Sequence, residues 1–150
     1  MQKTTVVAVG KLKERFWKDA CAEYLKRLSA YTAITVREVP DSTIDREEAA
    51  VLAALDKLPA DAHIILLDIQ GKQASSTQLA QKLESLAVQG VSHVAFVIGG
   101  SDGVTPTVAA RCNERLSFGP ITLPHNLARV VLLEQVYRAH KIIRGEPYHK

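Results

Sequence analysis

The run HIILLDI at residues 63–69 decides the fold class that the sequence predicts. It is apolar almost throughout and lacks the alternation of polar and apolar residues that marks a strand with one face in water. Such a run is suited to a strand at the centre of a parallel sheet, where both faces are covered. We therefore predict an α/β fold built around this strand.

The segments on either side of this run alternate between strand and helix patterns. Short β-rich or alternating runs predict strands at 4–9, 33–39, 93–98 and 115–118. Apolar residues spaced three and four apart predict helices at 12–28, 45–58 and 126–143, and two more that begin at the caps Ser75 and Thr105. Strands that alternate with helices predict one domain, with a parallel sheet and helices on both faces.

Three loops follow the predicted strands at the edge where α/β proteins bind ligands, outside the carboxyl ends of the strands. They are 67–71, 99–103 and 118–124. The loop 99–103 (GGSDG) allows the backbone to approach a ligand closely. It lacks the dinucleotide-binding order G-x-G-x-x-G, and no G-x-x-x-x-G-K-[ST] motif occurs in the chain. A tight strand-to-helix turn explains this loop about as well as a ligand site does.

The segment 116–125 (LSFGPITLPH) is apolar but irregular. Gly119, Pro120 and Pro124 disfavour a regular strand, since proline has no backbone donor. Some backbone N–H and C=O groups are then left without a hydrogen-bond partner in the sheet. Such groups can bind the edge of a planar base such as adenine. A buried connection between a strand and a helix is the alternative that these residues leave open.

The predicted C-terminal helix and the tail hold side chains with several chemical uses. The helix places Arg129, Glu134 and Arg138 among apolar residues on more than one side, as in helices that pack against a partner subunit as well as their own core. Glu134 and Arg138 are four residues apart, which allows an ion pair. The tail 148–150 (YHK) offers a stacking ring, an imidazole and a cation, although such tails are normally frayed.

The distribution of charge is more informative than the net charge of +3. Residues 1–30 carry seven Lys and Arg against three acids, residues 31–124 carry seven against eleven, and residues 125–150 carry five against two. Basic ends around an acidic middle suggest a polyanionic partner that contacts both ends. Two solvated helix faces are an equally good explanation of the charge alone.

Several other classes of protein are disfavoured. No apolar run approaches the roughly 20 residues that span a bilayer, and the N-terminus lacks the layout of a signal peptide, so we expect a cytoplasmic protein without membrane contact. Cys21 and Cys112 lie far apart without zinc-binding or CxxC spacing, so we expect buried apolar fillers. Asp68, Asp102 and Glu134 form no evident metal cluster, and we expect no metal.

Five segments, taken together, resemble those of a known family. They are AVGKLKE at 8–14, LLDIQGK at 66–72, IGGSDG at 98–103, LPHNLARVVLLEQVYRA at 123–139 and PYHK at 147–150. In length and in the order of these motifs, nearly the whole chain is similar to the ribosomal RNA large subunit methyltransferase H family. The C-terminal motifs are the most specific part of the resemblance.

The resemblance implies a SPOUT methyltransferase fold with a deep trefoil knot near the C-terminus, in a homodimer. It implies S-adenosylmethionine as the cofactor and N3 of a pseudouridine in 23S ribosomal RNA, on the assembled ribosome, as the target. The cofactor would be held by the knot loops, at Leu67, Gly99, Phe118, Gly119, Pro120, Ile121, Thr122 and Leu123. At 118–120 the relatives are more often rich in Leu and Ser.

The reaction that the resemblance implies needs few catalytic groups. The methyl group must be held in line with N3, and N3 must lose its proton to a base or beside a cation. We assign Arg138 as the cationic group, His149 as the candidate general base, and Tyr148 as a stacking or hydrogen-bonding group.

In so short a chain, RNA recognition must come from the same domain. The basic helix at 11–27 and the basic C-terminal helix are the expected phosphate-contacting surfaces. We expect dimerisation to complete each site with residues of the partner. The sequence leaves open a SPOUT enzyme for another RNA, such as tRNA, and a non-catalytic ribosome-binding module.

Overall fold

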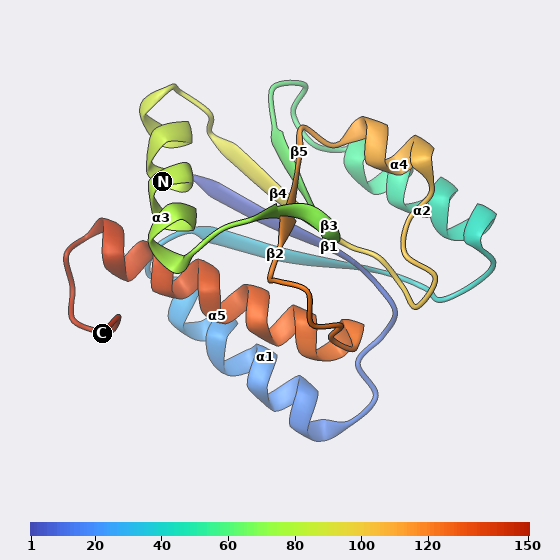
Figure 1. Cartoon of the computed structure of the whole chain (residues 1–150), viewed down its shortest axis with the longest axis horizontal. Coiled ribbons are helices and arrows are strands. Elements are labelled where there is room, and N and C mark those ends of the chain that lie inside the picture. Colours follow the sequence, from blue (N-terminus) through green and yellow to red (C-terminus); the bar gives the residue numbers. More distant parts are fainter.

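Five parallel strands form one sheet, and the computed structural model describes all residues from 1 to 150. The strands are β1 (Lys3–Val9), β2 (Ala33–Val39), β3 (His63–Gln73), β4 (His93–Ile98) and β5 (Glu114–Ser117). The helices are α1 (Arg15–Leu28), α2 (Ile44–Asp56), α3 (Ser76–Val88), α4 (Pro106–Arg111) and α5 (His125–Ile143). The strand order is β2-β1-β4-β3-β5, and every neighbouring pair is parallel (Figure 1). The predicted α/β class is confirmed.

Helices cover both faces of the sheet, as predicted, and each face has its own core. On one face, Val6 and Phe96 pack with buried residues of α1, α3 and α5. On the other face, their neighbours Val7 and Val97 pack with residues of α2 and α4. Alternate side chains of the strands thus enter opposite cores, which explains why these strands are apolar throughout. Figure 1 shows α1 and α5 on one side of the sheet and α2 and α4 on the other.

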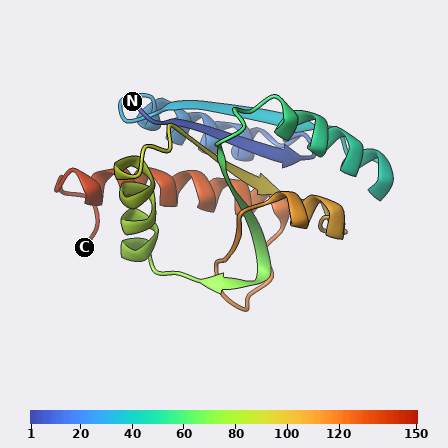
Figure 2. The ribbon, with the colours of Figure 1, turned by 90° about the horizontal axis from the view of Figure 1, so that it is seen from above.

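The strand β3 departs most from the prediction. It lies between β4 and the edge strand β5, so the run 63–69 is interior, but β4 is the central strand. β3 also continues to Gln73 rather than ending at 69, because it pairs with β5 twice: Leu67 and then Lys72 lie opposite the same Leu116. Residues 68–71 are left out of the ladder between these pairs. Figure 2 shows β3 and the chain that follows β5 running side by side, away from β1 and β2.

Several helix ends also differ from the prediction, two of them by more than one residue. α1 begins at Arg15 rather than at residue 12, although Leu12 is buried in the core that α1 covers. The prediction started the helix too early because Leu12, in the loop before α1, packs into the same core and fits the apolar spacing. α2 ends at Asp56, with Lys57 as its C-cap, two residues before the predicted end. The predicted capping box of α3 is confirmed, since Ser75 and Gln78 exchange side-chain and backbone hydrogen bonds.

Both cysteines are free, and they differ in burial. Cys21 is buried within α1, as expected. Cys112 is only half-buried and caps the end of α4, where its Sγ donates to the Val108 carbonyl at 3.3 Å. No helix of the structure combines the length and the apolar composition that crossing a membrane would require.

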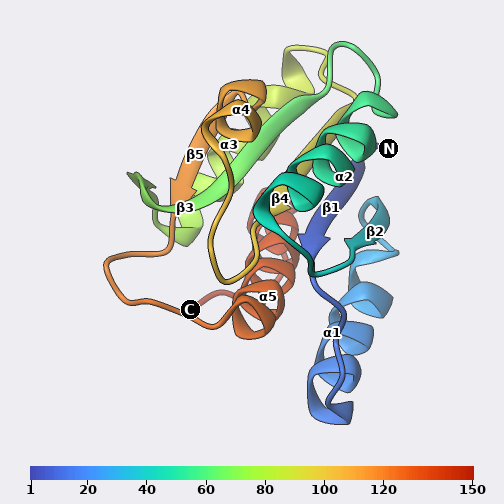
Figure 3. The same ribbon diagram turned by 90° about the vertical axis from the view of Figure 1, so that its right-hand side faces the viewer.

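The final helix is tied to the far side of the sheet. After β5, at one edge, residues 118–124 lead to α5, whose buried Arg129 donates to the Gly10 carbonyl at 2.8 Å and to Glu38 at 2.6 Å. These contacts fix the start of α5 at the carboxyl ends of β1 and β2. Figure 3 shows the chain after β5 crossing to α5 at this edge of the sheet. The trefoil knot implied by the resemblance stays a prediction.

Candidate functional site

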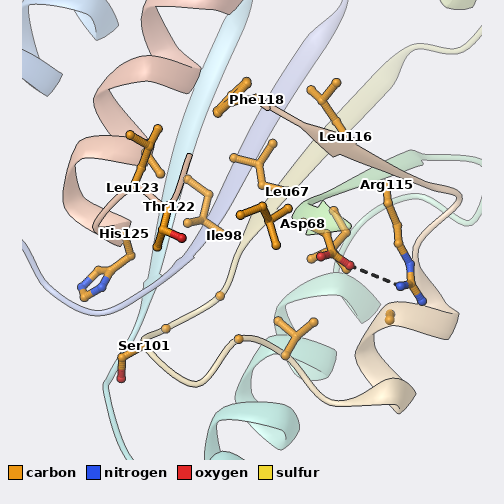
Figure 4. Close-up of a pocket in the computed structure, with 18 of the residues that line it drawn as sticks. Leu67, Asp68, Ile98, Ser101, Arg115, Leu116, Phe118, Thr122, Leu123 and His125 are labelled. Atoms are coloured by element: carbon orange, nitrogen blue, oxygen red, sulfur yellow. Dashed lines mark hydrogen bonds and ion pairs between the residues drawn. The ribbon is translucent and has the colours of Figure 1, made fainter. Parts of the chain in front are cut away.

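A cavity of about 970 Å³ opens at the carboxyl ends of β3 and β4. Its walls come from the three loops that the sequence selected: the end of β3, the glycine loop after β4, and the segment after β5 (Figure 4). Of the eight predicted cofactor residues, the cavity is lined by Leu67, Gly99, Phe118, Gly119, Ile121, Thr122 and Leu123. Pro120 belongs to the same loop but does not line the cavity. Seven of the eight residues thus line one pocket, and their role as cofactor contacts stays a prediction.

The glycine loop is shaped by a close backbone approach at Gly99. A Cβ atom added there would lie 2.9 Å from the backbone carbon of Gly103, a distance that no side chain tolerates. Gly103 closes the turn with a 3.0 Å hydrogen bond from its N–H to the Gly100 carbonyl and has a φ of +75°. Glycine is needed at 99 for space and at 103 for its backbone conformation.

The loop after β5 is irregular, and part of its backbone has no partner. Ser117 Oγ accepts a hydrogen bond from the Gly119 N–H at 3.0 Å and donates to the Gly119 carbonyl at 3.1 Å. Gly119 has a φ of +109°, which turns the chain toward the cavity. The N–H groups of residues 121–123 donate no hydrogen bond within the chain. These groups are available to a ligand, as the irregular apolar segment suggested.

An ion pair at the rim of the cavity was not predicted. Asp68 accepts from Arg115 Nη1 at 3.2 Å and from the Gln70 N–H at 3.0 Å. Gly71 permits this arrangement, because a Cβ there would lie 2.8 Å from the backbone of Arg115. The available signal was the position of Asp68 as the only acid within the apolar run 63–69. Its partner depends on the pairing of β3 with β5, which the sequence pattern does not contain.

The predicted catalytic side chains Arg138, Tyr148 and His149 do lie together, at the other end of α5. Arg138 Nε donates to Glu134 at 2.7 Å, and Arg138 Nη1 lies 3.1 Å from His149 Nδ1. The guanidinium carbon lies 4.7 Å from the centre of the Tyr148 ring. The predicted pair of Glu134 and Arg138 is confirmed, and it raises the pKa of Arg138 above its ordinary value.

This contact restricts the chemistry of His149. Arginine has only donors, so Nδ1 of His149 must accept. A neutral imidazole then carries its hydrogen on Nε2, and His149 presents a donor to whatever lies beyond it. His149 can take up a proton only at Nδ1, after the contact with Arg138 opens. The pKa of the neighbouring Tyr148 is raised, first by burial and then by the carboxylate of Glu134.

The tail is packed rather than frayed, because all four tyrosines of the chain cluster around it. The Tyr137 ring lies 4.9 Å from Tyr148, 5.9 Å from Tyr31 and 6.4 Å from Tyr24, measured between centroids. Tyr24 and Tyr31 belong to the N-terminal third of the chain, and no spacing in the sequence linked them to the tail.

The turn between α5 and the tail is also fixed. Gly145, at a φ of +67°, donates to the Ile142 carbonyl, and Glu146 donates to the Lys141 carbonyl, which together form a Schellman motif. The Glu146 carboxylate accepts from Tyr31 Oη at 3.0 Å and from Lys141 Nζ at 3.2 Å. The hydrogen bond from Lys141, and then that from Tyr31, lower the pKa of Glu146. The tail thus leaves α5 in a defined direction.

The cavity and the tail lie far apart within one chain. The cavity is lined by His125 and Ala128 in the first turn of α5, whereas Arg138 lies thirteen residues after His125. At 1.5 Å per residue this corresponds to about 20 Å along the helix. The chain therefore does not bring Arg138, Tyr148 and His149 to its own cavity.

The comparisons with known proteins agree with the resemblance. A family model described as a predicted SPOUT methyltransferase matches residues 2–149. The ribosomal RNA large subunit methyltransferase H of Listeria monocytogenes serotype 4b is 52% identical, over 97% of this chain and 98% of that protein. The chain belongs to this family of SPOUT methyltransferases. The enzyme of the same name from Bacillus cytotoxicus is 51% identical, with the same coverage of both chains.

Solved structures support the SPOUT fold. A probable methylase family protein from Haemophilus influenzae Rd KW20 superposes with a TM-score of 0.59 at 14% identity, over 99% of this chain and 71% of that one. TrmJ from Z. mobilis ZM4 gives a TM-score of 0.55 at 13% identity, over 100% and 73% of the two chains. At such low identity these matches concern the fold alone.

Proposed function

We propose that this SPOUT methyltransferase uses S-adenosylmethionine to methylate N3 of a pseudouridine in 23S ribosomal RNA, on the assembled ribosome. The observation that carries the proposal is the full-length similarity to proteins named ribosomal RNA large subunit methyltransferase H, which includes both the cavity loops and the tail. The geometry of these two regions is consistent with the two halves of a methyl-transfer site.

The cavity is suited to S-adenosylmethionine. Its volume lies near the upper end of the roughly 300–1,000 Å³ typical of small-molecule sites. Leu67, Phe118 and Leu123 offer apolar contacts for an adenine ring, and the free N–H groups of residues 121–123 offer donors for its edge. The Asp68 carboxylate lies at the rim, where it can accept from hydroxyls or attract a cation. When bound, the cofactor supplies a methyl group that is already activated by its sulfonium.

The tail is suited to the target base. Arg138 places a permanent positive charge where a deprotonated N3 would be favoured. Tyr148 offers a ring for stacking, and His149 offers an Nε2–H donor while Arg138 occupies its Nδ1. The role of His149 as a general base requires the base or its phosphates to draw Arg138 away, which frees Nδ1 to accept the N3 proton.

A homodimer would join the two regions. Leu127, Val130 and Val131 of α5 stay partly exposed in one subunit, which leaves an apolar strip for a partner. If two α5 helices pack antiparallel, the last turns of one lie against the first turns of the other. The tail of each subunit then faces the cavity of its partner. Sedimentation tests this arrangement, and a monomer at micromolar concentration would contradict it.

The direct test of the function is incubation with labelled S-adenosylmethionine and either assembled ribosomes or free ribosomal RNA from cells that lack this enzyme. We expect label on one pseudouridine of 23S RNA, and more of it with ribosomes. Mapping the modified nucleoside decides the position on the base. Label on tRNA instead would replace the proposed target, and binding of ribosomes without label or cofactor binding would indicate a non-catalytic module.

A further inference from the structure

The first turn of α1 carries an exposed pair of aromatic rings. Phe16 is 62% exposed, and its ring centre lies 4.8 Å from that of Trp17 at an angle of 56°. Trp17 packs against the core beneath α1 and is partly exposed. Trp17 is thus anchored to the core, and the Phe16 ring lies beside it in contact with solvent. The cavity and the tail do not use either side chain.

Four cations and one acid, the exposed Glu14, lie next to this aromatic pair within residues 11–18 of the chain. Lys11, Lys13, Arg15 and Lys18 are all exposed, and the eight ion pairs of the molecule involve other side chains. We call residues 11–18 the basic aromatic segment. Lys11 and Lys18 also line a second, smaller hollow of about 390 Å³ between α1, β2 and α5. A partner that fits this surface offers negative charge and a flat apolar face together.

The basic aromatic segment lies at the same edge of the sheet as the large cavity. It follows Gly10 at the carboxyl end of β1, and a Cβ at Gly10 would lie 3.2 Å from Nε2 of His125, which lines the cavity. Figure 3 shows the first turns of α1 and of α5 toward the same end of the molecule. A chain-like ligand that reaches the cavity can therefore continue over α1.

We propose that Phe16 and Trp17 form a stacking site for an unpaired base of the substrate RNA, whose flanking phosphates contact Lys11, Lys13, Arg15 and Lys18. This inference rests on the proposed function in taking RNA as the substrate. The two rings can stack on any base, because every base has a flat face. The cations can bind the flanking phosphates whatever the RNA sequence. The segment would then supply RNA affinity in a chain that has no separate RNA-binding domain.

A second copy of the chain fits this surface less well. A twofold dimer with this segment on its axis would bring the four cations of one subunit against the same four of the other. Like charges brought together in this way oppose association. RNA matches both features, because its phosphates can pair with the cations and its bases can stack on the exposed ring.

The test uses the fact that Trp17 is the only tryptophan of the chain, so its fluorescence reports on this site alone. The probe is a ten-nucleotide single-stranded RNA, and the competitor is a duplex of the same length. We expect saturable quenching by the single strand, weaker quenching by the duplex, and at least about fivefold weaker binding for Phe16→Ala. Phe16→Tyr should retain the affinity of the original protein.

The matched control is Val88→Ala, which truncates an apolar side chain that is 83% exposed at the end of α3. It should leave RNA binding unchanged, and thermal unfolding should confirm that both variants are folded. Unchanged binding by Phe16→Ala would overturn the stacking site. So would a Phe16→Ala variant whose main defect is a weaker homodimer, because the pair would then be a subunit contact.

The inference and the proposed function fail separately. If the protein methylates 23S RNA but Phe16→Ala binds RNA normally and methylates at the original rate, the stacking site is wrong and the function stands. If Phe16 governs binding of single-stranded RNA but no ribosomal RNA is methylated, the site stands and the proposed target is wrong.

Discussion

The two ends of α5 are built by different means. At its first turn, the cavity is formed mostly by irregular backbone, with two glycine-dependent turns and free N–H groups. At its last turns, the tail is held by side chains: four tyrosines, the Arg138–Glu134 pair and the Glu146 contacts. The first arrangement suits recognition of one small molecule by close fit. The second suits a charged surface, held in place by side-chain contacts, for a larger substrate. The comparison teaches that binding and catalysis should be separable by mutation.

The largest expected effect concerns the cavity. In Gly99→Ala the added Cβ would lie 2.9 Å from the backbone of Gly103, so the glycine loop cannot keep its shape. We expect loss of detectable S-adenosylmethionine binding in calorimetry, and with it all methyl transfer. Gly90→Ala is the matched control, since a Cβ there meets nothing within 4 Å. With a φ of +89°, Gly90→Ala should lose about 1 kcal/mol of stability and keep its cofactor affinity. Normal S-adenosylmethionine binding by Gly99→Ala would show that the cofactor does not bind in this cavity.

The next effect concerns the tail. Arg138→Ala removes the cation next to His149 and Tyr148, and we expect methyl transfer to fall by about 100-fold or more. Cofactor affinity should fall much less than methyl transfer, because Arg138 does not belong to the cavity wall. Arg144→Ala is the control, since Arg144 stacks on Tyr31 and does not contact His149. Equal losses in the two variants would mean that the tail needs positive charge in general rather than Arg138.

A smaller effect is expected at the base of the tail. Glu146→Gln keeps an acceptor for Tyr31 but removes the charge that Lys141 contacts. The tail should then sample other directions, and kcat should fall by roughly two- to tenfold with little change in the KM for S-adenosylmethionine. Steady-state kinetics measure both. The control is Asp56→Asn, which weakens another exposed ion pair, with Arg111, and should leave the kinetics unchanged.

The smallest effect is on stability and depends on pH. His140 is buried against Tyr31 with its Nε2 unpaired, and burial followed by the charge of Arg144 lowers its pKa from about 6.5. Because the unfolded chain binds this proton more readily, stability is full above about pH 6.5 and falls as the pH drops below it. Urea unfolding near pH 7.5 and pH 5.5 should show this loss. His140→Phe should reduce the difference; an unchanged difference would assign it to other groups.

The sequence predicted most of the fold and most of the cavity for the same reason. Strands and helices follow from local apolar patterns, and the rule that ligands bind at the carboxyl ends of parallel strands then selects the loops. Leu67, Gly99 and the loop 118–123 were within reach of that argument together with the family resemblance. The ion pair of Asp68 with Arg115 was not, because it depends on how β3 re-pairs with β5 beyond residue 69.

The order of the tail was also beyond local patterns. Its contacts join residues more than 100 positions apart, such as Tyr31 and Glu146. Three residues at a chain end without a helical pattern, such as 148–150, are expected to fray when taken alone. Only the packing of α1 beside α5 brings Tyr24 and Tyr31 to Tyr137 and thereby fixes Tyr148.

The central claim is that the cavity of one subunit works with the tail of the other, and mixing two inactive variants tests it most directly. Gly99→Ala and Arg138→Ala are unfolded together, refolded together and assayed for methyl transfer to ribosomes. Half of the dimers should then be mixed, each with one site that combines an intact cavity and an intact tail. The account predicts recovery of about a quarter of the original activity. A mixture that forms dimers and remains inactive would contradict it.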